Sequence, residues 1–176
     1  MTATEHVVLL GDDGTRRGTA DKSTVHTTDT PLHLAFSCHV YDPDGRVLVT
    51  RRALGKRTWP GVWTNSFCGH PAPDESQEEA LARRALLELG ILLSSISTVL
   101  PDFRYRAVDA SGMVENEICP VFTAVTMDAV DPNPAEVAEW EWVEPAALRA
   151  AVAATPFVFS PWLALQLEQW DGSPTI

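Results

Sequence analysis

The sequence Thr64-Asn65-Ser66-Phe67-Cys68-Gly69-His70-Pro71 places a thiol and an imidazole two residues apart, with one glycine between them. A predicted helix with the carboxylates Glu75 and Glu88 near its two ends follows directly. A free cysteine is usually a small buried hydrophobe, and only an accessible cysteine in electropositive surroundings is reactive. The combination nevertheless suggests a reactive site beside a metal site, and the rest of the chain must decide between these two interpretations.

The helix after this stretch has the clearest boundaries in the chain. Ser76 and Glu79 are three residues apart, which is the spacing of a capping box at a helix N-terminus. Gly90 can adopt the left-handed conformation that commonly follows the last helical turn. We therefore predict a helix that begins at Ser76 and stops at Gly90.

A β-hairpin is predicted before this helix. Alternating apolar residues indicate a strand over Leu32 to Tyr41, and Val47-Leu48-Val49 indicates its return strand. The turn between them is Asp42-Pro43-Asp44-Gly45, whose residue types are typical of tight turns. Further on, Trp59-Pro60-Gly61-Val62-Trp63 predicts a rigid turn packed on the core.

The remaining segments mix strands and helices without regular alternation. Residues 15–31 are polar and include Pro31, so we predict an extended loop there. The other predicted elements are strands at Thr4 to Leu10, at Phe103 to Val108, at Val114 to Val125 with an interruption at Pro120, and around Trp140 and Trp142, and helices at Pro145 to Ala153 and at Trp162 to Trp170 after an N-cap at Ser160. This irregular order favours an α+β fold.

The composition excludes several classes of protein. The formal net charge of −11 argues against a nucleic-acid partner, which needs a basic surface. No segment approaches the roughly 20 apolar residues that span a bilayer. The three cysteines are an odd number without paired spacing, so a disulfide framework is not expected. We expect a soluble cytoplasmic protein, either a monomer or a weak dimer.

Basic residues are few but concentrated. The chain has only two lysines, Lys22 and Lys56, and Lys56 lies in the cluster Arg51-Arg52-Ala53-Leu54-Gly55-Lys56-Arg57. A solvated surface loop is one interpretation of this cluster. The other is a pocket for a small, highly charged anion such as a diphosphate, whose oxygens suit Arg and Lys.

Three histidines and two glutamates form a candidate metal site: His26, His33, His70, Glu115 and Glu117. Each histidine alone is more often an ordinary surface or core residue. Glu115 and Glu117 point to the same face of a strand, which could be only the solvent side of a sheet. Together, however, five ligands exceed a structural zinc site and suit an octahedral divalent ion, either Mg²⁺ or Mn²⁺, with the imidazoles favouring Mn²⁺ or Zn²⁺.

The loop and helix after His70 resemble the Nudix box, a loop-helix-loop that binds a divalent cation on the diphosphate of a substrate. The matching residues are Gly69, Glu75, Arg83, Glu88, Gly90 and Ile91. The match is degenerate, because Arg84 and Leu87 stand where the box has carboxylates. Their loss weakens the case for hydrolysis, which needs a metal cluster to activate water. Arg84 and Glu88 could alternatively be an ordinary surface ion pair.

The departure from the box points to one branch of this superfamily, because the chain closely resembles the type 1 isopentenyl-diphosphate isomerases. The resemblance runs from about Glu5 to about Gln166. It rests on His26-Thr27, Leu32-His33-Leu34-Ala35-Phe36-Ser37, Thr50-Arg51-Arg52-Ala53-Leu54, Trp59-Pro60-Gly61-Val62-Trp63-Thr64-Asn65, Cys68-Gly69-His70-Pro71, Phe103-Arg104-Tyr105-Arg106-Ala107, Glu115-Asn116-Glu117-Ile118-Cys119-Pro120-Val121 and Phe159-Ser160-Pro161-Trp162.

The resemblance implies a fold and a domain organisation. We expect a Nudix-type α+β fold, with a mixed sheet packed between helices. We expect one isomerase domain over residues 1–176, with an N-terminal metal-ligand loop at about 15–33 and the Nudix-like loop-helix-loop at about 69–91. Because ligands from the N-terminal loop must be fixed in place, metal binding should help to fold residues 1–33.

The resemblance also implies residue roles. One divalent ion would bind His26, His33, His70, Glu115 and Glu117, and a Mg²⁺ carried with the substrate diphosphate would lie against Glu88. Cys68 and Glu117 would be the catalytic pair, with Tyr105 hydrogen-bonded to Glu117 and Trp162 over a carbocation. The diphosphate would bind Lys22, Arg52, Lys56 and Arg84.

The implied reaction interconverts isopentenyl diphosphate and dimethylallyl diphosphate in isoprenoid synthesis. It adds a proton at one carbon, forms a tertiary carbocation and removes a proton at another carbon. Glu117 would protonate the alkene in the forward direction, and Cys68 as thiolate would take a proton from the opposite face. Two alternatives stay open at this point, a Nudix diphosphohydrolase and a catalytically inactive diphosphate-binding module.

Overall fold

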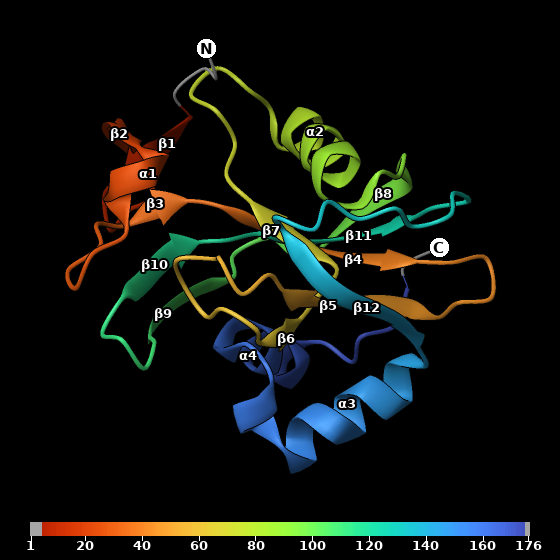
Figure 1. The fold of residues 1–176 in the computed structure, drawn as a ribbon. Helices are drawn as coiled ribbons and strands as arrows, with labels where there is room; N and C mark the ends of the chain where they lie inside the picture. The colour runs from red at the N-terminus through yellow and green to blue at the C-terminus, as the bar shows by residue number, and fades with distance from the viewer. Residues whose placement is uncertain (1–4, 175–176) are drawn as a thin grey trace.

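The computed structural model describes residues 5–174, which form two β-sheets with helices packed against them (Figure 1). Thr4, where we predicted the first strand to start, lies outside the described residues. The five-stranded sheet has the order β2-β1-β3-β10-β9, and the larger sheet has the order β12-β5-β4-β11-β8, with β6 paired to β5 and β7 paired to β4. The α+β fold expected from the sequence is confirmed.

The strands of the smaller sheet are β1 (His6–Leu10), β2 (Arg16–Asp21), β3 (His33–Leu34), β9 (Arg104–Val108) and β10 (Val114–Ile118). Those of the larger sheet are β4 (Phe36–Tyr41), β5 (Val47–Arg52), β6 (Trp63–Thr64), β7 (Phe67–Gly69), β8 (Ser94–Leu100), β11 (Val121–Val125) and β12 (Val137–Val143).

Helices cover both faces of the larger sheet (Figure 1). These are α2 (Gln77–Leu89), α3 (Pro145–Ala154), the 3₁₀ helix η1 (Pro156–Val158) and α4 (Pro161–Gln169). The short helix α1 (Lys22–Val25) contacts β1 and β2 of the smaller sheet instead. The α2 helix packs its buried face into one core with β4, β5 and β11, and α3 and α4 pack into a second core against Tyr41, Val47 and Val49. Among the described residues, no helix has both the length and the apolar character needed to span a membrane.

The predicted boundaries of α2 are confirmed by its caps. The Ser76 hydroxyl accepts from the Glu79 amide, and the Glu79 carboxylate accepts from the Ser76 amide at 2.9 Å. Gly90 has a φ of 67°, which is left-handed, and its amide donates to the Leu86 carbonyl. Because a Cβ at Gly90 would lie 2.8 Å from the Asp131 carbonyl oxygen, both conformation and space favour glycine here.

The prediction of a loop over residues 15–31 is wrong in part. This segment contains β2, which pairs antiparallel with β1 in the register Val7↔Ala20, and the short helix α1, which is capped by Asp21. Most β2 side chains are exposed and polar. Its order therefore comes from backbone pairing across the Gly11–Gly14 turn, and its sequence lacks the apolar alternation that signals a half-buried strand.

The segment predicted as one interrupted strand over Val114 to Val125 is two strands in different sheets. β10 ends at Ile118 and β11 begins at Val121, on either side of Pro120. The same change of sheet occurs between β3 and β4, which only Ala35 separates. β3 pairs parallel to β10, and β4 pairs parallel to β11, so the two chain segments lie side by side through both sheets.

Candidate functional site

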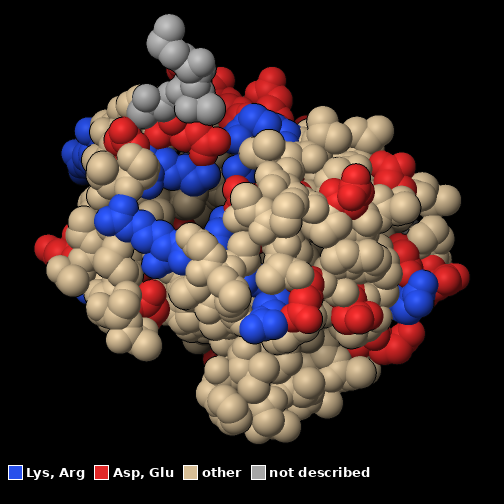
Figure 2. Space-filling model, viewed as in Figure 1, with Lys and Arg blue, Asp and Glu red and all other residues tan. Residues whose placement is uncertain are grey.

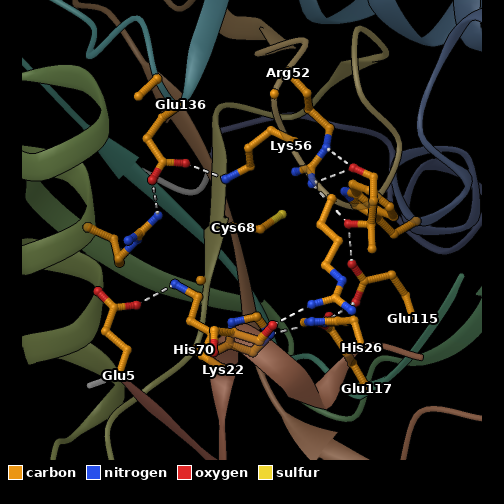
Figure 3. Close-up of a pocket in the computed structure, with 18 of the residues that line it drawn as sticks. Glu5, Lys22, His26, Arg52, Lys56, Cys68, His70, Glu115, Glu117 and Glu136 are labelled. Atoms are coloured by element: carbon orange, nitrogen blue, oxygen red, sulfur yellow. Dashed lines mark hydrogen bonds and ion pairs between the residues drawn. The ribbon is translucent and has the colours of Figure 1, made fainter.

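A charged cavity of about 580 Å³ opens between the smaller sheet and the loops around Cys68 and Lys56. Figure 2 shows Lys and Arg side chains gathered along a hollow on this face, beside acidic side chains. In Figure 3, Cys68 lies between the side that carries Arg52 and Lys56 and the side that carries His70 and Glu117. The cavity thus joins the candidate thiol, the candidate metal ligands and the basic cluster in one space.

Four of the five predicted metal ligands converge on one point. One ligand atom from each of His26, His33, His70 and Glu117 lies within 4.8 Å of the others. The Nε2 atoms of His33 and His70 are 3.2 Å apart, and Glu117 Oε1 is 3.4 Å from the first and 3.0 Å from the second. His33 Nδ1 donates to the Pro31 carbonyl at 2.9 Å, which fixes the ring so that its Nε2 faces the cluster.

The electrostatics of this cluster suit a cation. Burial lowers the pKa of His70 to about 4, so its imidazole is neutral at physiological pH. Burial alone would raise the pKa of Glu117, but hydrogen bonds from His33 and His70 hold it well below its usual range. Divalent metals bind neutral imidazoles and an ionised carboxylate, the states that His70 and Glu117 already have. Burial alone would lower the pKa of His33, but its hydrogen bond to Glu117 and the charge of that carboxylate raise it, so a bound ion would displace a proton there. The donor set therefore fits a divalent ion.

Glu115 lies beside the four-residue group and not within it. Its carboxylate accepts from the Thr58 hydroxyl at 2.7 Å and lies 3.1 Å from His26 Nε2. Both Glu115 and Glu117 are buried, so the alternative that they form a solvent-facing side of the sheet is wrong. Glu115 reaches the cluster through His26, which it holds in place.

The Tyr105 hydroxyl donates to Glu117 Oε2 at 2.9 Å, as the resemblance implied. Tyr105 is opposite Glu117 in the antiparallel β9–β10 pair, so strand register alone brings the two side chains together. Burial raises the pKa of Tyr105 well above its usual range, and the phenol is therefore a neutral donor. Glu117 is thus held on one oxygen by imidazoles and on the other by a phenol.

The Cys68 thiol lines the cavity and has two polar neighbours. Its sulfur donates to Asn65 Oδ1 at 3.4 Å and is 3.3 Å from the Ser37 hydroxyl. Burial raises the pKa of Cys68 to about 11. In this geometry the side chain is a thiol at neutral pH, not the thiolate that the resemblance implied for one step of the reaction.

Trp162 also lines the cavity, from the first turn of α4. Its indole Nε1 donates to Asn65 Oδ1 at 3.1 Å, so this oxygen accepts from both the indole and the Cys68 thiol. The Trp162 ring is 5.7 Å from the Tyr105 ring between centroids, and the Arg52 guanidinium carbon is 5.4 Å from its centroid. These neighbours fix the indole at the cavity wall.

All four predicted diphosphate-binding residues line the cavity: Lys22, Arg52, Lys56 and Arg84. Each already has a protein partner. Lys22 donates to Glu5 at 2.6 Å, Lys56 to Glu136, and Arg52 to the Thr58 carbonyl at 2.9 Å. The interpretation of the basic cluster as a solvated loop is therefore wrong for Arg52 and Lys56, which face the cavity.

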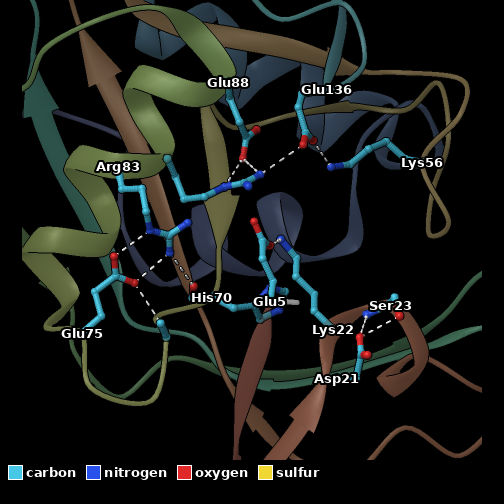
Figure 4. Close-up of polar contacts among 12 residues, drawn as sticks. Glu5, Asp21, Lys22, Ser23, Lys56, His70, Glu75, Arg83, Glu88 and Glu136 are labelled. Atoms are coloured by element: carbon cyan, nitrogen blue, oxygen red, sulfur yellow. Dashed lines mark hydrogen bonds and ion pairs between the residues drawn. The ribbon is translucent and has the colours of Figure 1, made fainter. Parts of the chain in front are cut away.

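Arg84 and Glu88 form a buried ion pair, so the alternative of a surface ion pair is wrong (Figure 4). Arg84 Nε donates to Glu88 at 2.8 Å, and Arg84 Nη2 also lies 3.4 Å from Glu136. Glu88 is not part of the histidine cluster. It lines a small hollow next to Cys68 and Glu136.

The other charged pair of the Nudix-like segment supports the loop that carries His70. Arg83 donates to both oxygens of Glu75, at 2.6 and 2.7 Å, and to the His70 carbonyl at 3.2 Å (Figure 4). The arginine and glutamate of the box therefore hold the loop that carries His70 against α2.

The cavity residues that the sequence reasoning missed include three with polar links to the site: Glu5, Thr58 and Glu136. Thr58 links Arg52 to Glu115, and Glu136 links Lys56 to Arg84. Each of the three is a single polar residue in a loop or at a strand end, outside any periodic pattern. No local sequence signal distinguishes it from ordinary surface residues.

This chain is similar in sequence to proteins of one known family. The NUDIX domain family matches residues 31–163. The isopentenyl-diphosphate Delta-isomerase of Clavibacter sepedonicus is 70% identical over 164 residues, covering 93% of this chain and 86% of the relative. The protein of the same name from Klebsiella pneumoniae is 52% identical over 170 residues, covering 97% of this chain and 92% of the relative.

Solved structures support the fold. DR0079 from Deinococcus radiodurans has a TM-score of 0.72 at 19% identity and covers 94% of this chain and 98% of its own. A MutT protein from Methanosarcina mazei has a TM-score of 0.62 at 21% identity and covers 80% of this chain and 94% of its own. At these identities the likeness extends to the fold alone.

Proposed function

Because this chain belongs to the type 1 isopentenyl-diphosphate isomerases of the Nudix superfamily, we propose that it interconverts isopentenyl diphosphate and dimethylallyl diphosphate. The observation that carries this proposal is the position of Cys68 and Glu117, which line one cavity together with five cationic side chains. Moving a double bond needs an acid and a base at two carbons, and the cationic side chains suit a diphosphate.

Cys68 and Glu117 are the proposed proton-transfer residues. Protonation of an unactivated alkene gives a tertiary carbocation, and loss of a proton from a neighbouring carbon restores the alkene in its new position. By resemblance, Glu117 delivers the proton in the forward direction and Cys68 accepts the other. In the present geometry the proton of the pair is on sulfur and not on the carboxylate. A forward turnover in that order therefore needs Glu117 protonated and Cys68 deprotonated when the substrate binds.

His26, His33, His70 and Glu117 are the proposed ligands of a divalent ion, with Glu115 as a fifth ligand or a support for His26. When bound, Mn²⁺, Mg²⁺ or Zn²⁺ there would supply positive charge that makes a protonated Glu117 more acidic. Tyr105 keeps a hydrogen bond to the second oxygen of Glu117 and so orients the carboxyl group toward the cavity.

The proposed diphosphate site consists of Lys22, Arg52, Lys56 and Arg84, with Glu88 as the residue that meets a substrate-borne Mg²⁺. Supporting this assignment, burial and the neighbouring charges of Arg84 and Lys56 lower the pKa of Lys22, and a bound anion would relieve the repulsion among these cations. The planar guanidinium of Arg52 is fixed by hydrogen bonds to Thr58, so its orientation is set before substrate binds.

Trp162 is the proposed stabiliser of the carbocation. A cation in a desolvated site over an indole face gains about 2 kcal/mol. Water would convert the cation to an alcohol, so the aromatic wall made by Trp162 and Tyr105 has a second task, which is to exclude water.

The proposal extends to the setting of the reaction. We propose that the chain acts in isoprenoid synthesis in the cytoplasm, as one domain and as a monomer or weak dimer, on a small prenyl diphosphate and not on nucleic acid. The net charge of −11 supports the exclusion of nucleic acid.

Deuterium incorporation tests the proposed function. The protein is incubated with isopentenyl diphosphate and Mg²⁺ in heavy water, and both the prenyl products and free phosphate are followed. We expect allylic product that carries solvent deuterium, and none with Cys68→Ala or Glu117→Gln. Phosphate release without deuterium in the hydrocarbon would show that the protein is a diphosphohydrolase and not an isomerase. Tight substrate binding with no turnover would show that it is an inactive binding module.

A further inference from the structure

Gln166 is a fully buried polar residue on α4 whose amide group connects two other buried side chains. Its Oε1 lies 2.9 Å from His39 Nε2, and its Nε2 donates to the Ser37 hydroxyl at 2.9 Å. Gln166 is not among the described residues that line the cavity. Its side chain is nevertheless only one residue removed from the candidate thiol, because Ser37 Oγ is 3.3 Å from the Cys68 sulfur.

The hydrogen bonds in this chain have one consistent direction. His39 is neutral, because burial lowers its pKa to about 4, and its Nε2–H donates to Gln166 Oε1. The Gln166 amide nitrogen then donates to a lone pair of Ser37. That bond leaves the Ser37 proton free to point at sulfur, and the Cys68 sulfur is one of the two that it can reach.

The opposite side of the Cys68 sulfur is held from the same helix. Trp162 lies one turn before Gln166 on α4, and its indole donates to Asn65 Oδ1, which also accepts from Cys68. Asn65 is itself oriented, since its Nδ2 donates to the Cys38 carbonyl at 3.0 Å and the Phe67 carbonyl at 2.8 Å. Trp162 and Gln166, which lie on one face of α4, are therefore both linked by hydrogen bonds to the Cys68 sulfur, the first through Asn65 and the second through Ser37.

We propose that Gln166 is a positioning residue for the isomerisation: through Ser37 it fixes the direction in which the Cys68 sulfur faces the cavity. This inference rests on the proposed function, since it concerns the group that exchanges a proton with the substrate. It goes beyond that function because Gln166 does not touch the cavity. Among the hydrogen bonds found in residues 5–174, none joins a proposed diphosphate-binding side chain to His39, Gln166 or Ser37.

A mutant cycle tests the inference. Gln166→Met keeps the length of the side chain and removes its amide, and Ser37→Ala removes the hydroxyl that Gln166 acts through. We expect each single variant to lower kcat about tenfold, the cost of one ordinary hydrogen bond, with little change in KM. The double variant should be no slower than Ser37→Ala alone, because the effect of Gln166 passes through Ser37.

Leu167→Ala is the matched control, because Leu167 is a buried neighbour on the same helix whose loss weakens packing without touching the hydrogen-bond chain. If it lowers kcat as much as Gln166→Met at an equal loss in Tm, Gln166 is only structural and the inference is overturned. Additive losses in the double variant would overturn it as well. Gln166→Glu provides a second test with nearly unchanged shape, since a carboxylate accepts from Ser37 and draws its proton away from sulfur.

A measurement without substrate separates this inference from the proposed function. The rate of alkylation of Cys68 by iodoacetamide is followed at one fixed pH, with mass spectrometry distinguishing Cys68 from Cys38 and Cys119. We expect Gln166→Met and Ser37→Ala to change this rate by the same factor and Leu167→Ala to leave it unchanged. An unchanged rate in Gln166→Met would overturn the inference even if the parent isomerises its substrate. A parent without turnover would overturn the proposed function and leave this result standing.

Discussion

Glu88 accepts hydrogen bonds from the guanidinium group of Arg84, one turn earlier on α2, and both side chains are buried. The same guanidinium lies 3.4 Å from Glu136, which in turn binds Lys56. A fixed cation therefore lies between two carboxylates at the edge of the cavity. The Nudix box has a carboxylate at the position of Arg84. Arginine at this position therefore replaces a negative charge by a positive one.

Replacing Arg84 should affect both stability and substrate affinity. Arg84→Met leaves Glu88 buried without its partner, and breaking a buried pair costs about 3–5 kcal/mol. It also removes one cation from the diphosphate site, so KM should rise. Denaturant unfolding and steady-state kinetics measure the two effects. Arg104→Met, which removes an exposed ion pair with Asp12, is the control and should change neither the free energy of unfolding nor KM. If Arg84→Met is as stable as the parent, the buried Arg84–Glu88 pair does not have the expected effect on stability.

Trp162 should matter less than Cys68. Trp162→Leu removes the indole face, and the loss of about 2 kcal/mol of cation stabilisation corresponds to a decrease in kcat of about thirtyfold. Cys68→Ala removes a proton-transfer group, which typically costs about 10²–10⁴-fold. Single-turnover rates of both variants give the comparison. If Trp162→Leu is the slower of the two, the indole does more than stabilise charge.

Metal binding should order the N-terminal strands. His26 and His33 lie on either side of the segment that joins α1 to β3, so an ion held by both ties this segment to Glu117 on β10. We expect hydrogen exchange in residues 16–34 to slow when Mn²⁺ or Zn²⁺ is added, and calorimetry to detect no ion binding in His33→Asn. His39→Gln, at a buried histidine outside the cluster, should still bind. Equal exchange with and without the ion would contradict this prediction.

Acid should destabilise the fold through His39. Its pKa is about 4 in the folded protein and about 6.5 when unfolded. Above pH 6.5 neither state is protonated, so His39 adds no pH dependence. Between pH 6.5 and 4 the unfolded state binds a proton at His39 that the folded state does not bind. The free energy of unfolding therefore decreases as the pH is lowered through this range.

The expected loss from His39 between pH 7 and pH 5 is about 2 kcal/mol. Urea unfolding at both pH values measures it, with His39→Gln as the comparison. The variant should lose less stability on acidification than the parent, because its side chain at position 39 does not titrate. Parallel losses in the two proteins would show that His39 does not carry the effect.

Sequence reasoning named residues that the fold does bring together around one cavity, but it missed some of the strands around them. The spacing of Glu115 and Glu117 placed both on one strand face, and the capping residues of α2 gave its ends. By contrast β2 was missed because its side chains are polar and exposed, and β8 because it begins with two exposed serines. Elements of this kind are specified by their partners, and single-sequence patterns do not contain that information.

The same limit applies to the links within the site. That Glu136 binds Arg84, or that Gln166 reaches Ser37 across 129 positions, depends on the packing of distant segments. The sequence supplied the residue types of the ligand set and of the cationic wall. Only the three-dimensional structure shows that Glu115 lies beside the four-residue group and that Arg84 and Glu88 are buried together.

The two parallel chain segments that run through both sheets determine where this protein tolerates changes in length. His33 and Ser37 lie on either side of Ala35, and Glu117 and Val121 are their partners in the neighbouring segment. One residue inserted at Ala35 or Cys119 would turn every following side chain to the other face of its sheet. The proposed metal ligands would then separate from one another, and Ser37 from the Cys68 sulfur, even with every residue type unchanged. Insertions in the turns Asp42–Gly45 and Asp109–Gly112 lie outside this segment pair. Loop grafts for biosensors or fusion partners therefore belong in those turns.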